Sequence, residues 1–394
     1  MQICRELPHH NRKSLMFLKC LTLTFVSYGL ILTFANFASA QSGRVQQTPT
    51  PTPDETIRVV TEEIKLNVLA FDEKGVFFGD VRAQDLVITE DNILHQPTSV
   101  RRIPANVLIV MDTGGEMRSV KTLDWTRKVA RGVIASLRPE DSIALMQYAE
   151  KAEIVTEWTI DRTAINDAVK RTNFGRRSAF ASALQLATDF FMRSGVDNKH
   201  LVLITDGTDT TVSIAQIGDE LKKLLATDIS VHVLSYTSME SRDIAPRTSM
   251  ISNTPPRSAM PDMVKDQLPK GGPQEAAKRP KIGPTINLDR TLIKKIKARK
   301  ADLEASQVQL EKIAENTNGV FILPESTDEM VEKAALVARM IDSSYVITYA
   351  PKNPVVEARS IPERSIEVTS KRPGLIVQAR RKLVFDPNVT VRTK

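Results

Sequence analysis

The sequence contains only two cysteines among its 394 residues, Cys4 and Cys20, and both lie near the amino end. Residues 1–40 have the pattern of a secretory signal peptide: a basic start, the apolar run LTLTFVSYGLILTF, and the small residues ASA before Gln41. The alternative is an uncleaved signal anchor, because a run of this length could just span a bilayer. Cleavage would leave a mature chain without thiols, which excludes disulfides, thiolate metal sites and a catalytic cysteine. We therefore expect an exported protein, periplasmic or extracellular, with no membrane span after cleavage.

The sequence also has few of the groups on which enzyme active sites depend. Three histidines lie beyond residue 40, His95, His200 and His232, and their spacing matches no metal-binding motif. There is no Gly-x-Ser-x-Gly elbow and no phosphate-binding loop. The segment VMDTGG is similar to the Asp-Thr-Gly signature of aspartic peptidases, but no second copy occurs and residues 117–137 have a helical pattern. We expect no catalytic activity, with an aspartic peptidase as a remote alternative.

The positive charge belongs to one part of the chain. The formal net charge is +7, of which residues 1–40 carry +3. Residues 239–303 hold fourteen basic and seven acidic side chains, so the rest of the mature chain is slightly acidic. Nucleic acid is therefore a poor fit as a partner of an exported chain. The basic residues of this segment predict either the solvated face of a helix or peripheral contact with anionic lipid or an acidic partner: Lys294, Lys295, Lys297, Arg299 and Lys300.

The patterning predicts several segments. Residues 41–56 form a Pro/Thr-rich linker, and residues 57–103 alternate apolar and polar side chains in the manner of a small β module. Apolar strands then alternate with helical patterns over residues 105–343, which predicts a doubly wound α/β domain. Its sheet should be mostly parallel, with one antiparallel edge strand, because two strands near residue 150 are joined too tightly for a crossover.

Two segments remain outside this pattern. Residues 237–290 are rich in Pro, Ser, Lys and Met and lack periodicity, so we expect a flexible basic insertion. Residues 344–385 return to strand patterns, but they supply too few strands for an independent sheet. They either pair with the N-terminal module in a discontinuous β-sandwich or pack separately on the α/β domain.

Two apolar strands of the α/β domain each deliver an aspartate to their carboxyl ends, Asp112 in NVLIVMDTGGEMRS and Asp206 in KHLVLITDGTD. Ligands of open parallel sheets bind in the crevice beyond those ends. Two carboxylates there, completed by hydroxyl or further carboxyl oxygens, indicate a site for a hard cation.

This arrangement resembles the von Willebrand factor type A (VWA) domain, from about Ala105 to Ile341. The stretches DEKGVFFGDVRAQDLVITEDN, IAENTNGVFIL, SSYVITYAP and RPGLIVQARRK resemble bacterial VWFA-related domain proteins, found abundantly in acidobacteria. The family has a Rossmann-like fold and a metal-ion-dependent adhesion site, built from Asp-x-Ser-x-Ser, a threonine and a second aspartate.

The resemblance implies a degenerate version of that site. Asp112 and Asp206 match its two aspartates, and Ser178 stands in the place of the threonine. Gly114 and Glu116 replace the two serines. A site of Asp112, Glu116, Ser178, Asp206 and water could hold Mg²⁺, Mn²⁺ or Ca²⁺. Alternatively, Arg118 or another nearby base neutralises the carboxylates and no metal binds.

These observations predict an exported, non-catalytic protein that acts in protein–protein interaction or adhesion. It would bind a protein partner through the loops at the carboxyl end of its sheet. The resemblance implies that an acidic residue of the partner completes a bound metal. The alternative is a structural scaffold or envelope-assembly component that acts without metal.

Overall fold

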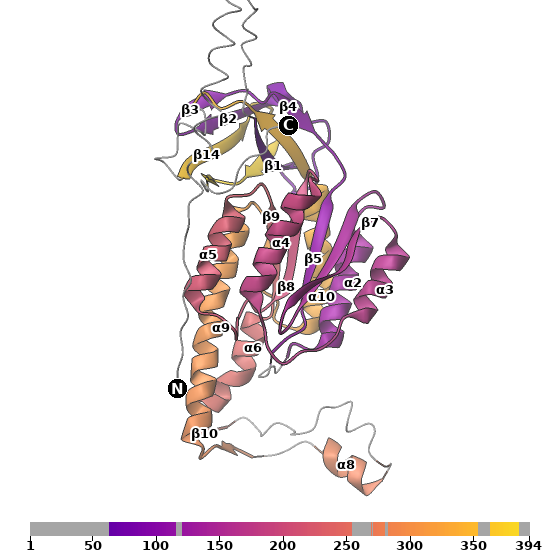
Figure 1. The fold of residues 1–394 in the computed structure, drawn as a ribbon, viewed down its shortest axis with the longest axis vertical. Helices are drawn as coiled ribbons and strands as arrows, with labels where there is room; N and C mark the ends of the chain where they lie inside the picture. The colour runs from indigo at the N-terminus through magenta and orange to yellow at the C-terminus, as the bar shows by residue number, and fades with distance from the viewer. Residues whose placement is uncertain are drawn as a thin grey trace, which may run out of the picture. The chain divides into compact units, whose positions relative to one another are not determined.

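A six-stranded sheet lies at the centre of the computed structural model, which describes residues 63–115, 120–253, 269, 271–279, 283–353 and 363–385 (Figure 1). The strand order is β12-β9-β8-β5-β6-β7, and only β7 runs antiparallel to its neighbour. The predicted doubly wound α/β class, with its antiparallel edge strand, is therefore confirmed. The strands are β5 (Asn106–Asp112), β6 (Ser142–Tyr148), β7 (Ala152–Thr159), β8 (Lys199–Thr205), β9 (Ser230–Ser235) and β12 (Phe321–Ile322).

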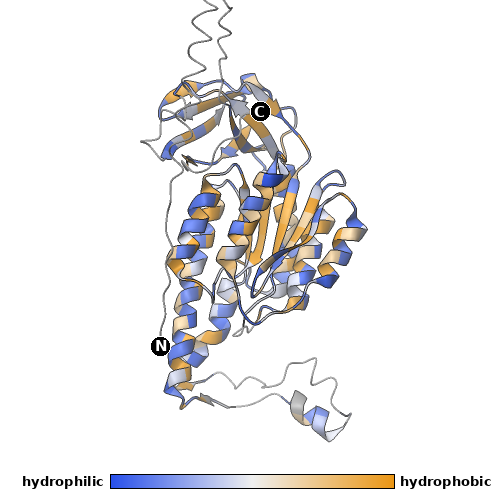
Figure 2. Cartoon of the chain, in the orientation of Figure 1, coloured by the Kyte–Doolittle hydropathy of each residue, from blue (hydrophilic) through white to orange (hydrophobic). Residues whose placement is uncertain are grey.

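Helices cover both faces of this sheet. On β5, Val107, Ile109 and Met111 enter one core, while Leu108 and Val110 enter the other. This two-sided burial explains why the strand is a continuous apolar run (Figure 2). One face is covered by α2 (Leu123–Ser136), α3 (Arg162–Arg171) and α10 (Thr327–Asp342), the other by α4 (Phe180–Ser194), α5 (Ile214–Leu225) and α9 (Arg290–Asn316).

The helices begin at residues that suit the first turn. The hydroxyl of Thr122 accepts a hydrogen bond from the backbone of Trp125, and Ser213 forms a capping box with Gln216 at the start of α5. The carboxylate of Asp289 accepts from two backbone N–H groups of α9. These short-range signals fix where each helix enters the layer that covers the sheet.

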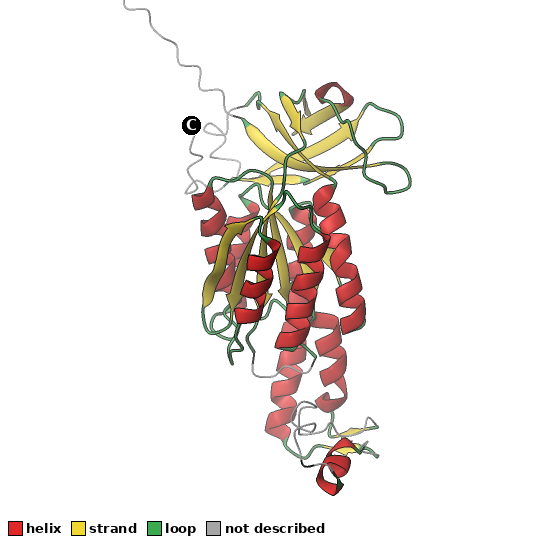
Figure 3. Ribbon diagram, turned by 90° about the vertical axis from the view of Figure 1, so that its right-hand side faces the viewer, coloured by secondary structure: helices red, strands yellow, loops and turns green. Residues whose placement is uncertain are grey.

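Strands from both ends of the described chain build two further antiparallel sheets (Figure 3). Ile64 at the start of β1 pairs with Tyr349 at the end of β13, so the two strands lie side by side along their length. Leu66, Ile88, Ile347 and Ile366 meet in the core between the sheets. One sheet contains β1 (Ile64–Phe71), β4 (Ser99–Arg101), β13 (Ser344–Tyr349) and β15 (Ile376–Ala379); the other contains β2 (Leu86–Glu90), β3 (Ile93–His95), β14 (Glu363–Ser370) and β16 (Lys382–Val384). A short 3₁₀ helix, η1 (Ala83–Asp85), precedes β2.

This sandwich packs against the amino-terminal edge of the six-stranded sheet. The side-chain amide of Asn67 donates to Ser230 Oγ (3.2 Å), and Asn318 donates to the carbonyl of Asn67 (3.1 Å). The guanidinium of Arg380 is buried against the carbonyls of Thr227 (2.6 Å) and Ile229 (3.3 Å). The opposite edge of the sheet, where the parallel strands end, therefore carries the loops of the candidate site.

The expectation of an irregular insertion from Thr237 onward is wrong for residues 237–252. Helix α6 (Thr237–Ile244) is followed by η2 (Ala245–Thr248) and by β10 (Ile251–Ser252), which pairs with β11 (Thr285–Ile286). Buried Ile244 packs on Ile296 and Leu303 of α9. The sequence of this segment shows no hydrophobic periodicity that would have indicated this contact. Within the insertion, α8 (Gly272–Lys278) is also helical.

Some of the predictions concern residues that the structure does not describe. The signal peptide (1–40), the linker (41–56) and residues 254–268 lie outside the described residues. Among the residues that are described, no helix is long and apolar enough to span a bilayer.

Candidate functional site

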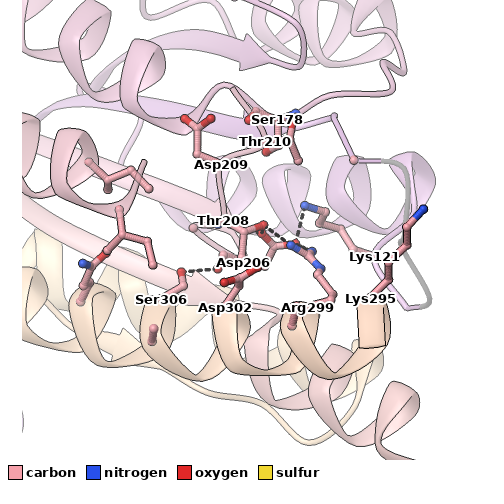
Figure 4. Close-up of a pocket in the computed structure, with 17 residues that line it drawn as sticks. Lys121, Ser178, Asp206, Thr208, Asp209, Thr210, Lys295, Arg299, Asp302 and Ser306 are labelled. Atoms are coloured by element: carbon pink, nitrogen blue, oxygen red, sulfur yellow. Dashed lines mark hydrogen bonds and ion pairs between the residues drawn. The ribbon is translucent and has the colours of Figure 1, made fainter. Parts of the chain in front are cut away.

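The two predicted aspartates come together at the carboxyl edge of the sheet. Asp112 is the last residue of β5, and Asp206 directly follows the neighbouring strand β8. Both side chains are fully buried. Between them lies the ammonium group of Lys121, 2.6 Å from Asp112 Oδ2 and 2.8 Å from Asp206 Oδ2. Figure 4 shows the contact of Lys121 with Asp206. The side chain of Lys121 is only 1% exposed, so the cation is built into the protein interior.

Helix α6 holds Lys121 in place. The carboxylate of Glu240, itself buried, accepts hydrogen bonds from the backbone N–H groups of Val120 (2.7 Å) and Lys121 (2.6 Å). Thr122, the next residue, caps α2. Lys121 is thus fixed on both sides before its side chain reaches the aspartates, which lowers the entropic cost of ordering a long side chain.

A second cation reaches the site from α9. Arg299 Nη2 lies 3.0 Å from Asp206 Oδ2, and Nη1 donates to Thr208 Oγ1 at 2.5 Å. Ser306 Oγ donates to the carbonyl of Asp206 at 2.6 Å. Burial opposes ionisation of Asp206, but the charges of Lys121 and Arg299 outweigh it and hold the pKa of this carboxyl well below its usual range.

The remaining carboxylate lone pairs are met by neutral donors. Asp112 Oδ1 accepts from the backbone of Gly114 (3.1 Å), and Asp112 Oδ2 also accepts from Thr205 Oγ1 (3.2 Å). Asp206 Oδ1 accepts from both the N–H and the hydroxyl of Thr208 (3.0 and 2.6 Å). Each of the four carboxylate oxygens therefore has at least one donor, as a buried pair of charges requires.

Tyr148 of β6 closes the network from the side of the sheet. Its hydroxyl lies 2.6 Å from Thr205 Oγ1, within the same buried cluster. Burial and the charges of Asp112 and Asp206 raise the pKa of Tyr148 well above its ordinary value. The phenol is thus kept neutral, and it adds a dipole rather than a charge to the site.

The other predicted positions have different outcomes. Ser178 is 2% exposed, and its hydroxyl has no hydrogen-bond partner among the described residues. It lines a pocket of about 300 Å³ together with Lys121 and Asp206 (Figure 4). A Cβ added to Gly114 would lie 1.8 Å from the carbonyl oxygen of Arg177, so a serine cannot fit this backbone. Glu116 and Arg118 lie outside the described residues.

These residues do not fit a divalent cation between the aspartates. An ammonium already occupies that position, and a metal at about 2.0–2.1 Å from the same oxygens would lie against it. Gly114 supplies no oxygen, and the described part of the chain has no group of three or more His, Cys, Asp or Glu side chains that could hold a metal. Of the predicted ligands that the structure describes, Ser178 keeps a hydroxyl without a hydrogen-bond partner.

The pocket lies between the loops at the carboxyl edge and the N-terminal half of α9. Its wall combines charges of both signs with hydroxyl groups and one exposed apolar side chain, Ile214. The polar residues that line it include Lys295, Arg299, Asp302, Asp209, Thr210 and Ser306. Such a wall presents hydrogen-bonding groups beside apolar surface.

Two residues central to this geometry were not named from the sequence. Lys121 is a nearby base of the kind that the metal-free alternative required, since Arg118 and Lys121 are the basic residues between Asp112 and α2. Arg299 was assigned to the basic surface of α9. Its role depends on a packing contact between residues 93 positions apart, for which the sequence carries no local signal.

Comparison with known proteins gives a consistent result. Residues 107–208 match the model of the von Willebrand factor type A domain. An uncharacterised protein of Borreliella burgdorferi is 22% identical over 207 residues, which are 48% of this chain and 60% of that protein. The chain thus spans less than two thirds of this relative.

Solved structures match this chain at low identity and low TM-score. A von Willebrand factor type A structure from Catenulispora acidiphila is 12% identical, with a TM-score of 0.39, and the match covers 84% of this chain and 76% of that one. An aerotolerance-related membrane protein from Bacteroides fragilis is 14% identical, with a TM-score of 0.36 over 59% of this chain and 98% of that one.

Proposed function

We propose that this chain, which contains a von Willebrand factor type A domain, is an exported, non-catalytic protein that binds a protein partner without a divalent cation. The observation that carries the proposal is the position of Lys121 Nζ between Asp112 Oδ2 and Asp206 Oδ2. The fixed positive charge that a metal would supply is here part of the chain. The loops at the carboxyl edge can then keep one conformation at any concentration of divalent ion.

The partner surface would be formed by the loops around the pocket. Ile214 is 52% exposed at the first position of α5 and lines this pocket. Exposed apolar side chains beside hydrogen-bonding groups are typical of a contact with another protein.

A crosslinking pull-down from envelope fractions tests this proposal. We expect the wild type to capture the same partner with and without a chelator. Ile214→Glu should reduce capture, whereas Ile160→Glu should not. Ile160 is 65% exposed and follows β7, which is antiparallel and therefore ends where the parallel strands begin. The two variants thus compare the same substitution at the two ends of the parallel strands. An acidic residue at the start of α5 favours the helix, and Ile214→Glu should therefore fold.

Two results of the pull-down would contradict this proposal. Loss of the partner on chelation would contradict the metal-free site. Equal capture by both variants would move the contact away from the carboxyl-edge loops and support the scaffold alternative, in which the β-sandwich makes the contacts.

A further inference from the structure

A group of exposed apolar side chains lies around the start of α9, before the turns of this helix that line the pocket. They come from the β10–β11 ribbon and from the residues that lead into the helix. We call them the apolar tip: Met250 (46% exposed), Ile251 (65%), Ile286 (63%), Leu288 (75%) and Leu292 (40%). Scattered exposed apolar residues are ordinary, but five in one short region indicate a contact surface.

The ribbon geometry gathers these side chains together. Ile251 and Ile286 pair directly across β10 and β11, so their side chains project from the same face. The backbone N–H of Asn287 donates to the carbonyl of Met250 at 2.8 Å and extends the pairing by one step. Leu288 and Leu292 follow at a spacing of four residues, on the way into α9.

The tip is attached to an ordered base. Ile244 of α6 packs on Ile296 and Leu303 of α9, and Ile293 is also buried. Figures 1 and 3 show α9 continuing beyond the carboxyl edge of the six-stranded sheet to the ribbon. The residues of the apolar tip therefore belong to elements at the end of α9 that lies away from the β-sandwich.

Cations follow the tip along the first turns of α9. Arg290, Lys294 and Lys297 are spaced i, i+4 and i+7 along α9, so they share one face of the helix. We call this face the basic stripe. None of the three forms an ion pair with a carboxylate in the described part of the chain, whereas Lys300, further along, pairs with Glu304 at 2.5 Å. The carboxylate of Asp289 is engaged in capping the helix.

We propose that the apolar tip and the basic stripe dock this protein on an anionic lipid surface. The exposed apolar side chains would enter the headgroup region, and the cations of the stripe would bind lipid phosphates. Charge complementarity favours this occupant, because the stripe needs anions next to an apolar phase. The proposal is independent of the partner site at the sheet edge.

Vesicle cosedimentation tests this docking with residues 41–394, which contain every described element. Vesicles of phosphatidylcholine with phosphatidylglycerol are compared with vesicles of phosphatidylcholine alone. We expect binding to the anionic vesicles only, weakening as salt is added. The double variant Ile286→Ser/Leu288→Ser should weaken vesicle binding about tenfold or more. The double variant Lys294→Glu/Lys297→Glu should weaken vesicle binding by at least about fivefold for each lysine replaced.

Matched controls change the same residue types elsewhere. Val76→Ser/Ile376→Ser replaces exposed apolar residues of the sandwich, and Lys222→Glu/Lys223→Glu gives the same net charge change on α5. Both should bind as the wild type does. Absence of binding to anionic vesicles at low salt, or equal loss in tip and control variants, would overturn the proposal. A dimer that the tip variants convert to monomers, without vesicle binding, would identify a self-association surface instead.

Discussion

The ammonium of Lys121 lies 2.6 Å from the carboxylate of Asp112, and neither side chain is more than 1% exposed. A buried charge pair costs desolvation energy, so its geometry has to compensate through direct contact and further hydrogen bonds. Here the cation serves two aspartates at once, and neutral donors meet the other oxygens. The result is a closed charge network at the edge where a family site would open to solvent.

Removal of this cation should be strongly destabilising. Lys121→Met keeps most of the side-chain volume but leaves two buried carboxylates with Arg299 as their nearest positive charge. We expect a loss of about 3–5 kcal/mol in the free energy of unfolding at pH 7, measured by urea denaturation. Lys128→Met, on the exposed side of α2, should change stability by less than about 1 kcal/mol. A small effect of Lys121→Met would show that the pair is not buried as described.

Smaller substitutions at the same position should create a metal-binding site. Lys121→Ser removes the ammonium, leaves room between the aspartates and adds a hydroxyl. We expect millimolar Mg²⁺ to raise the Tm of this variant but not that of the wild type, in calorimetric scans with and without EDTA. A Mg²⁺-dependent Tm in the wild type would contradict the metal-free site.

Restoration of the family serine at Gly114 should fail. The added Cβ would meet the Arg177 carbonyl oxygen at 1.8 Å, so the backbone would have to move. We expect Gly114→Ser to lower stability by about 1–3 kcal/mol and to confer no Mg²⁺ binding. Gly218→Ser is the control, because nothing lies within 4 Å of its added Cβ and the residue is helical. That variant should be neutral or slightly stabilised.

Acid should destabilise the protein through a buried histidine pair. His232 Nε2 lies 3.0 Å from His200 Nδ1, and His200 Nε2 lies 2.9 Å from Asn198 Oδ1. The backbone N–H of Val320 donates to His232 Nδ1 (3.3 Å), so the network is complete when both rings are neutral. Burial lowers the pKa of His232 to about 3, and burial with the charge of His232 lowers the pKa of His200 well below its ordinary value.

The lowered pKa values of the two histidines determine how the free energy of unfolding changes with pH. Below the ordinary pKa of 6.5, the unfolded chain binds protons that the folded chain refuses. Stability is therefore full above about pH 6.5 and falls toward pH 3, by up to about 1.4 kcal/mol per pH unit for each histidine. Urea titrations between pH 7 and pH 5 should show this slope, and His200→Gln should reduce it. An unchanged slope in the variant would assign the effect to other groups.

The contact between the sandwich and the α/β domain should depend on Arg380. Its guanidinium donates to the carbonyls of Thr227 and Ile229, and burial lowers its pKa to about 10, so it remains charged at neutral pH. Arg380→Ala should cost about 2–3 kcal/mol, because the buried carbonyls lose their donor. The neighbouring Arg381→Ala is exposed and should have little effect. Similar losses in both variants would show that the junction does not depend on this residue.

The fold was largely readable from the sequence because its strands are buried on both faces. Runs such as Asn106–Asp112 are long and apolar, and the helices between them begin at capping residues. Helix α6 was missed because its buried residues contact different parts of the fold. Met239 packs in the sheet core, Glu240 accepts from the backbone of Val120 and Lys121, and Ile244 packs on α9. Local patterns do not record a partner chosen by long-range packing.

The candidate site was readable only in part, for a related reason. Asp112 and Asp206 follow buried strands, so their meeting at one edge is a consequence of parallel topology. Parallel topology does not determine that Lys121 lies between the two aspartates, since the side chain of Lys121 could have faced solvent from its loop. The direction in which a long side chain points depends on Glu240 and α9, which belong to other parts of the chain.

The pairing of Ile64 with Tyr349 has a consequence for how the chain folds. Strand β1 leaves the ribosome early, but its neighbours β13 and β15 follow the entire α/β domain. The sandwich cannot close before that domain has brought the two ends together, because contacts so distant in sequence form slowly in an unfolded chain. We expect folding in two phases, with the apolar face of β1 uncovered during the first. In that interval the nascent chain is most exposed to aggregation and to proteases.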